Sequence, residues 1–400
     1  MYRLVQRRGI IGLFCLLFVA SSVVPGWAQK DNRFEVSKNL DIFNSLLKEV
    51  EMFYVDSVDV DKTVQRGIEA MLAGLDPYTE YYPEQKTEEL SLMTTGEYGG
   101  IGSLIRQRNN EGGVMIAEPT EGMPADLAGL KPGDLILAID TIDVSKATNS
   151  RVSELLKGVP NTKMVLTIQR PGEKKPRKFE ITRKQITTPQ VTYYGVKNDS
   201  IGYIYLKAFT IKSAQEVKEA FLDLKKNHNI KSLVLDLRGN GGGVLEGAVQ
   251  IVGMFVPKGS EVLSTKGKIK QWDRTYRTST EPLDTVMPLA ILINGGTASA
   301  AEIVSGSLQD MDRAVLVGQR SFGKGLVQAP RDLPYNGKVK ITMSKYYIPS
   351  GRCIQQIDYS HRKEDGSVAA IPDSLTSVFY TSKKRPVRDG GGVRPEFEVK

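Results

Sequence analysis

A serine and a lysine, 25 positions apart, are the residues of this 400-residue sequence best suited to chemistry. Ser299 lies in the small-residue segment 297–302, which follows an apolar run and opens a predicted helix. Its hydroxyl would lie at the positive end of the helix dipole, either as a nucleophile or only as an N-cap. Lys324 stands between Gly323 and Gly325, where desolvation could lower its pKa and make it a base. The pair is therefore a candidate for nucleophilic catalysis.

Histidine and cysteine are too scarce to supply the common alternatives. The sequence has two of each, so a zinc site built from them would use all four. His228 lies in a charged turn and His361 in a polar loop, and we expect both at the surface. Cys15 lies in a predicted signal peptide, which leaves Cys353 without a disulfide partner. We expect no metal and no cofactor, and a lysine rather than a histidine as the base.

The region from residue 190 to 400 alternates predicted strands and helices. Its Ile/Leu/Val runs predict a buried, largely parallel sheet. Ligand sites on such sheets lie beyond the carboxyl ends of strands, where Ser299 and Lys324 both fall. Gln328, four residues past the lysine, could orient its amine. The expected elements are strands 201–206, 232–237, 289–293 and 314–317, and helices 213–226, 245–254 and 300–308.

Two glycine-rich segments invite nucleotide interpretations that the residues do not support. Segment 239–243 lacks the last small residue of a dinucleotide fingerprint because Val244 stands there, but its amides could approach a ligand or an oxyanion. Segment 318–325 matches a phosphate-binding P-loop except at Gly325, which replaces the magnesium-binding hydroxyl. Pro330 follows soon after and disfavours the required helix. An NTPase is therefore the weakest reading.

The first 28 residues have the pattern of a secretory signal peptide. Three arginines precede an apolar stretch at 10–24, and small residues at 26 and 28 suit cleavage near Ala28. We expect export to the periplasm or cell envelope, with an uncleaved membrane anchor as the alternative. Cleavage removes three positive charges and lowers the net charge from +8 to +5. Without an arginine-rich patch, nucleic acid is not an expected partner.

Two further regions precede the core. Apolar residues at helical spacing predict helices at 34–53 and 61–72 within a largely helical stretch 34–92, a packing or dimerisation module. Short strands at 114–118, 135–139, 164–169 and 178–182, with a helix at 150–157, predict a small β-rich module. The predicted domains are the signal peptide 1–28, the helical region 29–95, the β-rich module 96–184 and the α/β core 185–400.

The motifs together resemble the carboxyl-terminal processing (tail-specific) serine proteases, from about residue 40 to 399. Segments 235–243, 297–302 and 322–328 match in order, and 345–352 looks like the strand after the site. Thr297 stands where the family usually has serine, and the sequence stops at Lys400, where many relatives continue. The resemblance implies an α+β multidomain fold: a helical module, a PDZ domain and an α/β protease core with a mostly parallel, ClpP/crotonase-like sheet.

The resemblance also implies residue roles. Ser299 would attack the peptide carbonyl, Lys324 would be the general base and then protonate the leaving amine, and Gln328 would position Lys324. In the PDZ domain, segment 123–134 matches the central turn. The oxyanion hole would use the amides of Ala300 and of Gly242 or Gly243, and the carboxylate-binding loop would be Gly99, Gly100, Ile101 and Gly102.

We therefore expect an exported serine endopeptidase that recognises protein C-terminal tails through its PDZ domain. Its expected partners are proteins or peptides with exposed C-termini, a second copy bound through the N-terminal helices, and adaptor proteins. The alternative is a noncatalytic PDZ-containing envelope scaffold. Retention of Ser299, Lys324 and Gln328 together disfavours that alternative.

Overall fold

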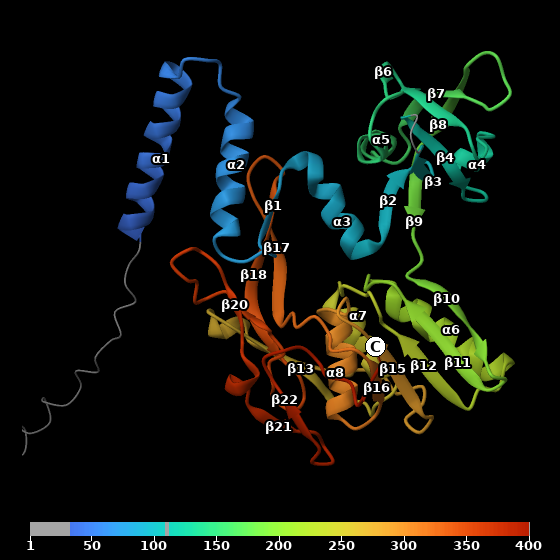
Figure 1. The fold of residues 1–400 in the computed structure, drawn as a ribbon, viewed down its shortest axis with the longest axis vertical. Helices are drawn as coiled ribbons and strands as arrows, with labels where there is room; N and C mark the ends of the chain where they lie inside the picture. The colour runs from blue at the N-terminus through green and yellow to red at the C-terminus, as the bar shows by residue number, and fades with distance from the viewer. Residues whose placement is uncertain (1–32, 109–111, 400) are drawn as a thin grey trace, which may run out of the picture. The chain divides into compact units, whose positions relative to one another are not determined.

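The computed structural model describes residues 33–108 and 112–399, so the predicted signal peptide lies outside the described residues. The chain divides into two compact units, 1–68 and 69–400, which are considered separately. Figure 1 shows the element order from the blue N-terminal helices to the red C-terminal segment. No helix of the described ranges is both long enough and apolar enough to cross a membrane.

The first unit consists of helix α1 (Arg33–Phe53) and most of α2 (Val60–Ala73), close to the predicted bounds. No residue of α1 is buried. A row of large apolar side chains on α1 is instead 48–72% exposed: Phe34, Leu40, Phe43, Leu46 and Phe53.

The β-rich module is an antiparallel sheet with its own apolar core, formed by residues such as Ile116, Ile136 and Leu166. β3 (Ser103–Gln107) is the edge strand that follows the predicted carboxylate-binding loop. All four predicted strands and the predicted helix are present. The sheet runs in the order β3, β4 (Val114–Pro119), β5 (Leu135–Ile139), β7 (Lys163–Gln169), β8 (Arg177–Thr182), with β6 (Ile142–Asp143) beside β5 and helices α4 (Pro124–Leu127) and α5 (Asn149–Leu156).

The core sheet of the described residues has six strands. β10 and β11 pair antiparallel, and the other neighbouring strands pair parallel. Strands β11 and β15 have the predicted bounds, because their apolar runs end at clear turn signals. The strands in spatial order are β10 (Val191–Lys197), β11 (Ile201–Leu206), β12 (Ser232–Asp236), β15 (Leu289–Ile293), β16 (Val315–Gly318) and β23 (Phe397–Glu398), with helices α6 (Ser213–Asn227), α7 (Leu245–Gly253) and α8 (Ala300–Asp310).

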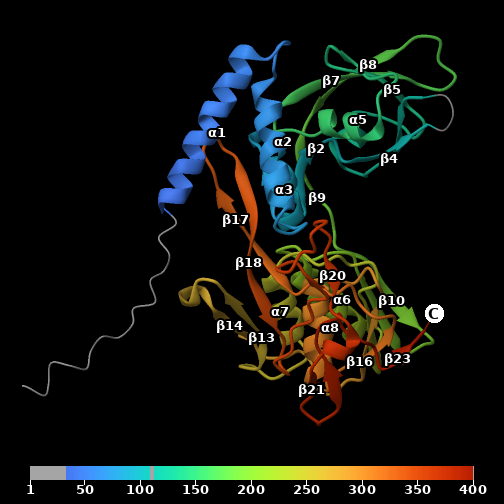
Figure 2. The same ribbon diagram turned by 60° about the vertical axis from the view of Figure 1, so that its left-hand side comes forward.

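A second, antiparallel sheet was not predicted. Its centre is β18 (Lys338–Tyr347), which pairs with β17 (Leu326–Asp332) in a long hairpin, drawn in orange in Figure 2, and with β13 (Glu261–Gly267). β1 (Glu80–Tyr82) also pairs with β18, so the helical prediction for 34–92 is wrong at these residues. Their backbone pairs with a strand far along the chain, and local periodicity cannot reveal such a partner. β14 (Arg274–Arg277) completes this sheet.

Shorter elements connect these parts. They are η1 (Glu84–Lys86), α3 (Thr87–Thr95), the antiparallel pairs β2 (Glu97–Gly100) with β9 (Lys184–Thr187), β19 (Ile357–Asp358) with β20 (Ala369–Ala370) and β21 (Val378–Tyr380) with β22 (Pro386–Arg388), and the turns η2 (Lys270–Trp272) and η3 (Asp373–Leu375).

Candidate active site

Ser299 is the last residue of the loop between β15 and α8, and its backbone is strained. Its φ of 56° and ψ of −117° are unusual for a residue with a side chain. The Ser299 amide donates a 2.8 Å hydrogen bond to Oε2 of Glu302 in the first turn of α8. A sharp strand-to-helix turn of this kind is typical of an exposed nucleophile.

Thr297 ties the loop of Ser299 to the loop that follows β12. Its buried hydroxyl donates to the carbonyl of Leu237 at 2.8 Å and accepts from the amide of Asn294 at 2.9 Å. The Asn294 side-chain oxygen accepts from the amide of Gly239 at 2.9 Å. Threonine supplies the one hydroxyl that these bonds need, so the departure from the family's serine leaves this link intact.

Gly242 lies directly against the serine. A Cβ at this position, where φ is +94°, would stand 2.8 Å from Cβ of Ser299 and 2.9 Å from the nitrogen of Ala300. The amide of Gly242 donates to Oδ1 of Asn240 at 2.9 Å. By contrast, no hydrogen bond within the described ranges uses the amides of Gly243 or Ala300. Of the two glycines left open by the sequence, the hydrogen bonding favours Gly243 as a free donor.

Glu302 links the serine turn to the lysine loop. Its buried carboxylate accepts hydrogen bonds from the amide and hydroxyl groups of four residues, and burial nevertheless raises its pKa. Sequence reasoning gave this residue no role, although Ser-x-x-Glu at 299–302 is a capping-box pattern. The four donors are the amides of Ser299 (2.8 Å), Gly323 (2.7 Å) and Lys324 (2.9 Å) and the hydroxyl of Ser321 (2.5 Å).

Lys324 lies in the loop between β16 and β17, so it follows the strand next to the one that precedes Ser299. Burial lowers its pKa to about 8, and the positive charge of Lys340 acts in the same direction. The amine lies 4.3 Å from the ring centroid of Tyr78. No hydrogen bond between this amine and Ser299 occurs in the described part of the chain. The carboxylates of Asp76, Glu302 and Glu80 oppose the lowering to a smaller extent.

The other candidate residues are placed as follows. Gln328 donates from Nε2 to Oγ1 of Thr342 at 3.0 Å, and no described hydrogen bond joins it to Lys324. His228 and His361 have side chains that are 51% and 86% exposed, which confirms the surface position predicted for both.

Two alternative chemistries find no support in the geometry. Segment 318–325 continues into strand β17, so the P-loop-like sequence has no helix N-terminus to bind phosphate. No group of three or more metal-binding side chains of His, Cys, Asp or Glu is present in residues 33–108 and 112–399.

The structure places only part of the predicted carboxylate-binding loop in a loop. Gly99 and Gly100 end strand β2 and pair with β9, while Ile101 and Gly102 lead into the edge of the β-rich sheet. The carbonyls of Ile101 and Gly102 accept from the amides of Ala125 (2.8 Å) and Thr120 (3.0 Å). Gly102 has φ of +65°, and a Cβ there would lie 2.5 Å from Cβ of Met123. The loop is therefore fixed through its carbonyls next to β3, whose outer edge has no strand partner within the described residues.

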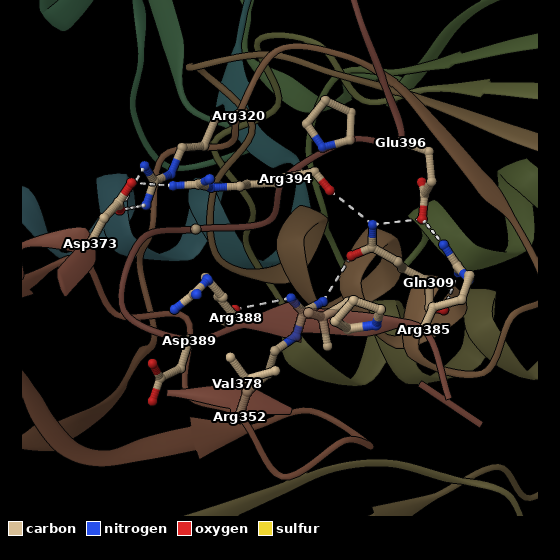
Figure 3. Close-up of a pocket in the computed structure, with 14 residues that line it drawn as sticks. Gln309, Arg320, Arg352, Asp373, Val378, Arg385, Arg388, Asp389, Arg394 and Glu396 are labelled. Carbon is tan, nitrogen blue, oxygen red and sulfur yellow. Dashed lines mark hydrogen bonds and ion pairs between the residues drawn. The ribbon is translucent and has the colours of Figure 1, made fainter. Parts of the chain in front are cut away.

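A separate cavity of about 420 Å³ lies among C-terminal residues and contains neither Ser299 nor Lys324 (Figure 3). Its buried Arg352 donates to Asp310 and Gln309, each at 2.8 Å. Arg385, which also lines the cavity, donates to Glu396 at 2.6 Å. The charged side chains that line this cavity therefore bond one another, which is consistent with a structural role for them.

Comparison with known proteins gives the family. The sequence model of peptidase family S41 matches residues 200–360, and that of the PDZ domain matches 115–170. The carboxy-terminal-processing protease of Bartonella bacilliformis is 36% identical over 345 residues, which are 86% of this chain and 77% of that protein. A probable CtpA-like serine protease of Staphylococcus aureus (strain COL) is 33% identical over 79% of this chain and 62% of its own length. Among solved structures, photosystem II D1 C-terminal processing protease is 26% identical over 92% of both chains, with a TM-score of 0.46.

The chain therefore belongs to peptidase family S41 and carries a PDZ domain. Members of its class are serine-type endopeptidases, and the resemblance inferred from the motifs is confirmed. The chain spans about three-fifths of the length of the Staphylococcus aureus relative.

Proposed function

We propose that this chain is an exported carboxy-terminal-processing endopeptidase that works with a Ser299–Lys324 dyad. The observation that carries the proposal is the position of Glu302, whose carboxylate binds the backbone of both residues. Ser299 and Lys324 follow neighbouring parallel strands, and Glu302 fixes the two loops to each other. The lowered pKa of Lys324 supplies a neutral amine near physiological pH.

The proposed reaction has two stages. The neutral amine of Lys324 takes the Ser299 proton as Oγ attacks the scissile carbonyl, and it then gives that proton to the leaving amine. Water, activated by the same amine, then releases the acyl group from Ser299. The amides of Gly243 and Ala300 are proposed to bind the oxyanion, since both are free of other described bonds. Gln328 would orient Lys324 after its amide turns away from Thr342.

Substrates are proposed to bind by their C-terminal tails. An extended tail would add to the free edge of β3, and its carboxylate would meet the loop Gly99, Gly100, Ile101 and Gly102. The carbonyls of Ile101 and Gly102 accept from the 120–125 turn. Because the amide of the next residue points away from each carbonyl in a trans peptide, this supports an outward direction for the amides of Gly102 and Ser103.

The proposal also covers the domain boundaries, the export and the oligomeric state of the chain. We take residues 29–95 as the helical region, 96–184 as the PDZ domain and 185–400 as the protease core. Export rests on the signal-peptide pattern of residues 1–28, with cleavage near Ala28.

The apolar row on α1 supports a homodimer through the N-terminal helices. Changing Phe43 and Leu46 to glutamate should then shift the sedimentation coefficient from that of a dimer to that of a monomer.

The decisive experiment is a paired cleavage assay. The mature chain, beginning after Ala28, is incubated with an unstructured peptide that bears a free, apolar C-terminus. Wild type should cleave it, while Ser299→Ala should bind the peptide without turnover. Equal cleavage by both proteins would show that Ser299 is not the nucleophile, and binding without cleavage by both would favour the noncatalytic scaffold.

A further inference from the structure

The turn between α2 and β1 carries Tyr78 onto the amine of Lys324. Asp76 makes this turn rigid, because its Oδ1 accepts from the amides of Tyr78 and Thr79, both at 2.8 Å. Oδ2 of Asp76 accepts from the Thr79 hydroxyl at 3.0 Å. Asp76 and Thr79 are buried, so the tyrosine projects from a fixed base.

The same turn is attached to the strand that also holds Gln328. The amide of Thr342 in β18 donates to Oγ1 of Thr79 at 3.1 Å, and its hydroxyl accepts from Gln328 at 3.0 Å. The Tyr78 ring also packs at a right angle against the ring of Tyr359, with centroids 6.0 Å apart. The position of the ring is therefore fixed both by its turn and by this ring contact.

Among the described residues, the ammonium form of Lys324 has no carboxylate partner. No ion pair to its Nζ occurs in the described ranges, where its contact is the face of Tyr78 at 4.3 Å. The nearby charged groups are already engaged: Glu80 pairs with Lys340, Asp76 bonds the 78–79 amides, and Glu302 bonds four other donors. Burial also raises the pKa of Tyr78, so its ring stays neutral and cannot supply a full negative charge.

We propose that Tyr78 is a positioning residue of the protease: its ring face holds the Lys324 amine and stabilises the ammonium that forms when Ser299 loses its proton. An aromatic face attracts an ammonium without offering it a proton acceptor, so the amine keeps its proton available for the leaving group. This inference rests on the proposed dyad. In proteases with a histidine base, a buried carboxylate orients the imidazole and stabilises its protonated form. Tyr78 would have the corresponding role for Lys324.

The test is a pH profile for three replacements of Tyr78 in the full mature chain. Tyr78→Phe keeps the ring face and should retain kcat and the apparent pKa. Tyr78→Leu keeps apolar volume without the quadrupole, and kcat should fall about threefold to thirtyfold with KM changed less than twofold. Its apparent pKa should fall by roughly half a unit or more. A pentafluorinated phenylalanine at position 78 keeps the shape, so it should fold and behave like the leucine variant.

A readout without catalysis separates this inference from the proposed dyad. In the Ser299→Ala background, the pH dependence of reductive methylation at Lys324, followed by peptide mass spectrometry, reports the amine directly. The fluorinated ring should move that profile to lower pH, whereas Tyr78→Phe should not. Unchanged labelling and unchanged kcat with the fluorinated ring would overturn the role of Tyr78. Tyr193→Leu is the matched control, because it removes another lysine–tyrosine contact, with Lys197, and should leave both profiles unchanged.

Discussion

At the scale of single residues, the proposed chemistry depends on the protonation state of one amine, that of Lys324. Water exclusion by the fold, rather than a charged partner, is the largest influence on the pKa of Lys324, which falls to about 8. A base must be neutral to accept the Ser299 proton. The cleavage rate should therefore rise with pH through about 8 and level off above it, and a profile that is flat from pH 6 to 10 would argue for another base.

The same shift predicts an effect on stability. A lysine whose folded pKa is below its ordinary value of 10.5 binds its proton more weakly when folded, so unfolding takes up protons between pH 8 and 10.5. Stability should rise with pH across that window. Lys324→Met should abolish cleavage and raise the free energy of unfolding at pH 7 by roughly 1–3 kcal/mol. Urea titrations at pH 7 and pH 11 check this, since the gain should vanish at the higher pH. Lys268→Met, at an exposed site, is the control.

Glu302 accepts hydrogen bonds from both loops of the proposed site, so replacing it should affect stability and rate together. Glu302→Ala would leave four donors without their acceptor, two of them buried and two partly buried, so the free energy of unfolding should fall by about 3–5 kcal/mol. Glu302→Gln keeps one carbonyl oxygen and should be less damaging, but its cleavage rate should still drop because the two loops lose their common anchor. Urea unfolding and kcat for both variants test this. A glutamine variant with wild-type stability and kcat would contradict the anchoring role.

At the scale of elements, the loop after β12 contains two adjacent glycines, of which one has room for a side chain and the other has none. A methyl group at Gly242 would collide with the backbone of Ala298 at 2.7 Å and with the serine, while one at Gly241 meets nothing within 4 Å. Gly242→Ala should therefore reduce kcat by at least about 100-fold, since small displacements of catalytic groups have such effects. Gly241→Ala should keep kcat within about threefold. Comparable losses from the two changes would mean that the loop is unimportant or uniformly fragile.

Elements built on local periodicity were predictable, and those built on distant pairing were not. Strands β11 and β15 are apolar runs bounded by turns, so their limits could be read directly from the residues. β18 alternates half-buried polar and apolar residues, and β1 has only three residues; each is stabilised by partners far along the chain. Local sequence does not encode such pairing.

In the candidate site, too, residues with a local sequence signal were predictable, and residues placed by distant pairing were not. Ser299 and Lys324 stand in recognisable glycine- and alanine-rich settings, and Glu302 could have been found from its capping-box spacing. Nothing near Tyr78 marks it as a neighbour of the lysine, because that contact depends on the β1–β18 pairing. The proposed preference for Gly243 over Gly242 rests on which amide is free of other hydrogen bonds, and only the fold determines that.

At the scale of the whole molecule, recognition and cleavage are proposed to reside in different domains. Amidating the substrate C-terminus removes the charge that the loop 99–102 is proposed to bind, but not the scissile bond. KM should then rise about tenfold or more with kcat nearly unchanged, since the loss concerns ground-state binding. Steady-state kinetics on matched free-acid and amide peptides measure this. Identical KM values would place tail recognition elsewhere.

The exposed positions of His228 and His361 also bear on how the enzyme could be inhibited. Reagents that inactivate serine hydrolases by alkylating a catalytic imidazole would find none at this site among the described residues. The amine of Lys324, about half of it neutral near pH 8, is itself a nucleophile toward aldehydes and activated esters. Peptides that carry such groups would be selective probes, because a lysine with the ordinary pKa of about 10.4 is almost entirely protonated at that pH.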